Sequence, residues 1–113
     1  MTRYDELKYL VPPRIQAILA AARRDPISGP LLSFRFYMRR HKRDVDEVRK
    51  RVDARLKYRT EEYSRRGLSI DRPDFITRTM RDEMELLYQL NYGIAVATEE
   101  YNAIRALAER HGN

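Results

Sequence analysis

Side chains capable of catalysis or metal binding are few in this sequence of 113 residues. The chain contains two histidines, His41 and His111, and no cysteine. This composition excludes disulfides, thiolate metal sites and cysteine nucleophiles. The sequence also lacks a glycine-rich phosphate loop, a serine elbow, zinc-ligand spacing and the glutamate–histidine spacing of di-iron bundles. We therefore expect no enzymatic activity, no catalytic residue, no metal site and no cofactor.

The remaining titratable groups have structural explanations. His41 falls at a core position of its predicted helix, which indicates a boundary histidine whose hydrogen bonds are satisfied. Asp82, Glu83 and Glu85 lie near the start of another predicted helix, where the helix dipole favours negative charge. Glu83 falls on the apolar side of that helix, so we predict that it pairs with Arg55 of the preceding helix.

Basic side chains are concentrated in the middle of the chain. Residues 31–66 contain thirteen basic and six acidic groups, whereas residues 67–113 contain five and eight. In a seven-residue frame the cations of the middle segment form an outward face, with acids such as Asp46 and Glu47 on a different flank. A face of one charge sign suits a polyanion or an acidic protein surface. The residues predicted to contact this anionic partner are Arg35, Arg39, Lys42, Arg43, Arg49, Lys50 and Lys57.

The identity of the anionic partner stays open at this point. Arginine outnumbers lysine by nineteen to four, and its planar guanidinium suits bidentate contact with phosphate or carboxylate. The alternative is an ordinary solvated helix face, salt-bridged in part to the acidic third segment. Tyr37, Tyr58 and Tyr63 would offer stacking platforms for single-stranded nucleic acid if exposed, although packing at the core or its boundary is the favoured role.

Proline and glycine divide the chain into three helical segments after an N-terminal stretch of residues 1–12. The helices are predicted at 13–24, 30–66 and 73–110, with Asp71 as the cap of the third. The short connection after Gly67 favours antiparallel neighbours. We predict an all-α single domain, a long helical hairpin with the short first helix packed across it. The capping-box spacing at Asp44 to Glu47 leaves open a break near residue 43.

Residues 86–97 are apolar on more than one face of the third helix, so a single neighbouring helix cannot cover them. One explanation is that the first helix covers the remaining side. The other is a contact surface for another protein, with Gly93 permitting close helix approach. The residues predicted for this protein interface are Leu86, Tyr88, Tyr92, Gly93 and Val96.

These observations favour a non-enzymatic subunit of a larger assembly, with a basic helix that contacts nucleic acid in a nucleoprotein complex. One alternative is a structural or adaptor protein of a virus particle, a secretion apparatus or a multi-subunit complex, which would self-associate when purified. Another is a small helical inhibitor. The sequence has neither eighteen consecutive apolar residues nor the pattern of a secretory signal. We expect the protein in the cytoplasm or within an assembled particle, with protein subunits rather than a membrane as partners.

Overall fold

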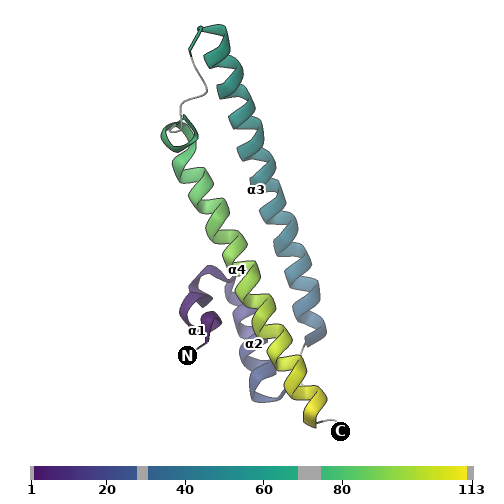
Figure 1. Ribbon diagram of the computed structural model, residues 1–113. Helices are drawn as coiled ribbons and strands as arrows, with labels where there is room; N and C mark the ends of the chain where they lie inside the picture. The colour runs from purple at the N-terminus through teal and green to yellow at the C-terminus, as the bar shows by residue number, and fades with distance from the viewer. Residues whose placement is uncertain (1, 28–30, 69–74, 112–113) are drawn as a thin grey trace.

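The computed structural model describes residues 2–27, 31–68 and 75–111, with the backbone alone at residues 75–79 and 111. These residues form helices α1 (Arg3–Leu7), η1 (Lys8–Leu10, a 3-10 helix), α2 (Pro13–Arg24), α3 (Leu31–Arg65) and α4 (Phe75–His111), and no strand occurs among them. In Figure 1, α3 and α4 run antiparallel as a long hairpin, and α1 and α2 lie beside the C-terminal part of α4. The all-α hairpin with a short helix packed on it is therefore confirmed.

The ends of α2 and α3 follow directly from their sequence. Pro13 occupies the first position of α2, where its missing N–H and fixed φ cost nothing. Gly67 has φ +70° just after α3, and its N–H donates to the Ser64 carbonyl at 3.1 Å while the Leu68 N–H donates to the Tyr63 carbonyl at 2.9 Å. This is the Schellman arrangement, which favours glycine at the left-handed position.

α3 is one continuous helix of 35 residues through the capping-box spacing near residue 43. Its buried residues are Phe34, Met38, Val45 and Val52, and the last three recur every seven residues along the helix. α4 has one irregularity, because Met80 adopts φ −137° and ψ 22° and kinks the helix near its start. The predicted cap Asp71 and the first predicted residue of the third helix, Pro73, lie outside the described residues.

The main core lies at the end of the hairpin where the N-terminal elements pack. Side chains from α1, the segment after η1, α2, α3 and α4 meet there; they are Tyr4, Val11, Ile15, Ile18, Leu19, Ala22, Phe34, Met38, Val96, Ala97, Tyr101 and Ile104. The molecule measures 66 × 26 × 22 Å with a radius of gyration of 19.1 Å, against roughly 13 Å for a compact domain of this length. The hairpin therefore extends well beyond its core.

The two long helices are also joined by a polar contact near the other end of the hairpin. The Arg55 guanidinium donates to the Glu83 carboxylate, which confirms the pairing predicted from their places on the two apolar stripes. The pKa of Glu83 is lowered by a hydrogen bond from its own backbone N–H and by the Arg55 guanidinium. The contact links α3 to α4 outside the main core.

The N-terminal stretch contains helices that the sequence pattern did not predict. The Thr2 hydroxyl accepts a hydrogen bond from the Asp5 N–H at 3.2 Å, and the Thr2 N–H donates to the Asp5 carboxylate at 3.1 Å. This capping box starts α1. η1 then brings Leu10 against Gly93 of α4, where a Cβ would stand 2.5 Å from the Leu10 carbonyl oxygen. The close approach that Gly93 permits is thus to the chain's own N-terminal stretch.

Candidate functional site

All seven predicted anion-contacting residues lie on α3, and their side chains are exposed. Their surroundings divide them into three groups. Arg49 and Lys50 are paired with acids, Arg35 is bound to a tyrosine, and Arg39, Lys42, Arg43 and Lys57 make no ion pair with any described residue.

Arg49 and Lys50 are neutralised by acids one turn earlier on the same helix. Arg49 Nη2 lies 2.5 Å from Asp46 Oδ1, and Lys50 Nζ lies 3.5 Å from both Asp46 Oδ2 and Glu47 Oε1. The hydrogen bond from Arg49 holds the pKa of Asp46 below its ordinary value. Placing Asp46 and Glu47 on a flank separate from these cations was therefore wrong, because side chains three and four residues apart meet on a helix surface.

Arg35 connects α3 to α4 through Tyr101. Its Nε donates to the Tyr101 hydroxyl at 2.7 Å, and the Tyr101 ring stacks on Phe34 with centroids 4.4 Å apart. Arg35 thus contributes to the packing of the hairpin, and its remaining N–H groups face the surface beside Arg39 and Lys42.

A shallow hollow of about 380 Å³ runs along the seam between α3 and α4, and we call it the basic groove. Its lining residues are Phe34, Arg35, Met38, Arg39 and Lys42 from α3 and Thr98, Tyr101 and Asn102 from α4. Three of these side chains are cationic and none is acidic. A second hollow adjoins it at Lys42 and continues along the seam past Arg49 to Leu87.

The predicted protein interface is divided between surface and core. Leu86, Tyr88 and Tyr92 are exposed, and the Tyr88 and Tyr92 rings lie edge to face with centroids 4.9 Å apart. Gly93 and Val96 are buried inside the chain. Residues 86–97 are therefore covered in part by the chain's own N-terminal elements, including α1 and η1 as well as α2, and in part remain open to solvent.

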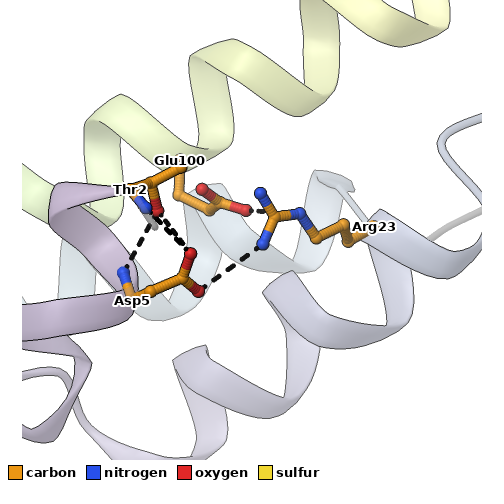
Figure 2. Close-up of polar contacts among 4 residues, drawn as sticks. All are labelled: Thr2, Asp5, Arg23 and Glu100. Carbon is orange, nitrogen blue, oxygen red and sulfur yellow. Dashed lines mark hydrogen bonds and ion pairs between the residues drawn. The ribbon is translucent and has the colours of Figure 1, made fainter.

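A buried carboxylate that was not predicted from the sequence lies where α1, α2 and α4 meet. Figure 2 shows Arg23 between Asp5 and Glu100, with Arg23 Nε 3.2 Å from Glu100 Oε1 and Nη1 3.6 Å from Asp5 Oδ1. Glu100 is 4% exposed. Burial raises its pKa, the Arg23 guanidinium opposes that change, and the Asp5 charge adds to it. Burial likewise raises the pKa of the neighbouring Tyr4 hydroxyl.

His41 lies at the boundary of the core, as predicted from its core position on the helix. Its Nε2 is buried and has no hydrogen-bond partner among the described residues, which differs from the expectation of a fully satisfied side chain. Burial lowers its pKa, and the nearby Asp44 carboxylate opposes the change only in part. His41 borders a hollow with Pro12 and Arg14 of the N-terminal elements.

Within the part of the chain that the structure describes, no three His, Cys, Asp or Glu side chains are grouped so as to hold a metal ion. No helix among the described residues is long and apolar enough to cross a membrane. Comparison with protein-family models, with curated proteins and with solved structures found no match.

Proposed function

We propose that the protein is a non-enzymatic subunit of a larger assembly and that it binds nucleic acid through α3. The observation that carries the proposal is the basic groove, whose lining contains three cations and no acidic side chain; the nearest acid, Asp46, lines the adjoining hollow and is paired with Arg49 and Lys50. Arg39 and Lys42 are free of ion pairs among the described residues, so their charges are available to an anion. Asn102 on the opposite wall adds a neutral amide group that can donate hydrogen bonds to phosphate oxygens.

The distribution of charge over the whole chain supports the same partner. Residues 31–66 carry more than the whole net charge of +6, and residues 67–113 oppose it. Cations in α3 that are not neutralised within the chain give a field that attracts a polyanion and makes its binding dependent on salt.

The proposal is tested by charge reversal at the groove and beside it. We expect the triple variant Arg39→Glu, Lys42→Glu, Arg43→Glu to lose at least about a hundred-fold in affinity for nucleic acid, because each site loses a charge-assisted hydrogen bond and gains repulsion. Affinity is measured by fluorescence anisotropy at fixed salt, and helix content by circular dichroism. All three side chains are exposed, so the fold should persist.

The matched control is the triple variant Lys8→Glu, Arg81→Glu, Arg110→Glu, which changes the net charge by the same amount at exposed positions on η1 and α4. We expect it to lose less than about five-fold, because screening weakens distant charges. Equal losses in the two variants would mean that net charge alone drives binding and would contradict a site on α3.

A second candidate function, a structural or adaptor subunit that binds proteins only, is favoured by the exposed apolar part of α4. Leu86 stands seven residues before Gly93 and so lies on the same side of the helix, yet it is 49% exposed where Gly93 is buried. Three results would favour this function over the first: light scattering detects a defined oligomer, Leu86→Glu converts it to monomer, and the protein does not bind nucleic acid at low salt.

A further inference from the structure

Phe36 is an exposed aromatic residue of α3, one turn before the run of cations from Arg39 to Arg43. Its side chain is 61% exposed, and Leu32 one turn earlier is also exposed. Arg39, Arg40 and Arg43 follow at three, four and seven residues, the spacings that place side chains on the same helix surface. An apolar ring thus lies among three arginines that make no ion pair with a described residue.

Contacts to α2 hold the surroundings of the Phe36 ring in place. Phe36 packs edge to face on Tyr37, with ring centroids 5.1 Å apart and an interplanar angle of 85°. The Tyr37 hydroxyl in turn accepts a hydrogen bond from Arg14 Nη1 at 2.9 Å, and the Arg14 guanidinium lies 4.7 Å from the Tyr37 ring centroid. A ring oriented before the ligand arrives loses little conformational entropy on binding.

We infer that the nucleic acid bound by α3 is single-stranded and that one of its bases stacks on Phe36 while the neighbouring arginines contact the phosphates. This inference rests on the proposed function and adds the class of ligand to it. Proteins that bind single strands combine aromatic stacking platforms with cations that follow the backbone. The bases of a duplex are stacked on one another and paired, so a duplex can use the arginines but not the ring.

The test compares Phe36→Ala with wild type on a single-stranded homopolymer and on a duplex of the same length at one salt concentration. The variant removes the stacking contact between the Phe36 ring and a base, so we expect the affinity for the single strand to fall by about ten-fold or more. The affinity for the duplex should change by less than about two-fold, because its phosphate contacts remain. Phe36→Tyr should retain wild-type affinity for both ligands.

The matched control is Tyr9→Ala, which removes an aromatic ring that is 73% exposed and lies on η1 rather than on α3. We expect it to leave both affinities unchanged. If Phe36→Ala weakens single-strand and duplex binding equally, or weakens neither, the stacking inference is overturned while the proposed function stands. If the wild-type protein binds neither ligand at low salt, the proposed function and the inference fail together. In that case, loss of a protein oligomer in Phe36→Ala would show that the Phe36 ring contacts another protein chain.

Discussion

Glu100 shows how the fold changes the chemistry of a single residue. The side chain is buried between the N-terminal elements and α4, and its one cationic neighbour, Arg23, is half exposed and shared with Asp5. Because burial is the largest influence, the pKa of Glu100 lies above its ordinary value of 4.5. A carboxyl whose pKa is raised by folding stabilises the folded state while protonated, and that contribution is lost as pH rises through the raised pKa.

We predict that Glu100→Gln increases the free energy of unfolding at pH 7 and above, because an uncharged amide of the same shape replaces an ion disfavoured by burial. The gain over wild type should shrink as pH falls and disappear below pH 4.5, where the wild-type carboxyl is protonated as well. Urea denaturation at several pH values measures this difference. Glu99→Gln, at an exposed neighbour paired with Arg3, should change the free energy of unfolding by less than about 1 kcal/mol. A loss of stability in Glu100→Gln at pH 7 would show that the attraction of Arg23 outweighs burial.

The sequence predicts polar contacts between residues whose helices are already paired by pattern, and it fails where a third element takes part. Arg55 and Glu83 are predicted to pair because each is a charged residue on the apolar face of its helix. The short connection between the two helices makes them antiparallel neighbours. Glu99 and Glu100 are adjacent in the sequence, yet Glu99 is exposed and Glu100 is buried. The difference arises because α1 and α2 pack against the side of α4 that carries Glu100. The pairs made by Arg49 and Lys50 have a different origin, because their acidic partners stand three and four residues earlier on the same helix, a spacing that the sequence already contains.

At the scale of the elements, the contact between η1 and α4 determines which part of α4 is covered. The expected helices were confirmed because proline, glycine and seven-residue periodicity give strong local signals over long segments. α1 and η1 are too short to show a period, so the cover that they provide for Gly93 was not predicted. Val96, which was predicted for the protein interface, therefore belongs to the core.

We predict that Gly93→Ala lowers the free energy of unfolding by about 1–3 kcal/mol, because the added methyl meets a backbone carbonyl that cannot rotate away. The new Cβ would stand 2.5 Å from the Leu10 oxygen and 3.0 Å from its carbonyl carbon. Urea denaturation measures the change. An exposed helical glycine would give the opposite sign, a gain of up to about 1 kcal/mol, and that result would contradict the close packing of η1 on α4.

Across the whole molecule, the two ends of the hairpin have different surroundings. At one end α1, α2, α3 and α4 contribute to the main core, and the same part of α3 lines the basic groove and carries the exposed Phe36. At the other end, described residues of α3 and α4 pack chiefly on each other through Val52, Met80 and the Arg55 to Glu83 contact. A ligand that binds at the basic groove and Phe36 is therefore held at the end of the hairpin that contains the main core.

The salt dependence of binding to a single-stranded homopolymer tests the central claim most directly. Arg39, Lys42, Arg43 and Lys57 are the predicted cations that no described residue neutralises, so about four phosphates should be contacted. For a single strand, four phosphate contacts correspond to a slope of about −3 when the logarithm of the association constant is plotted against the logarithm of the salt concentration. We predict micromolar or tighter binding at low salt with that slope. Absence of binding at low salt, or binding that does not weaken as salt is added, would contradict a nucleic-acid site on α3.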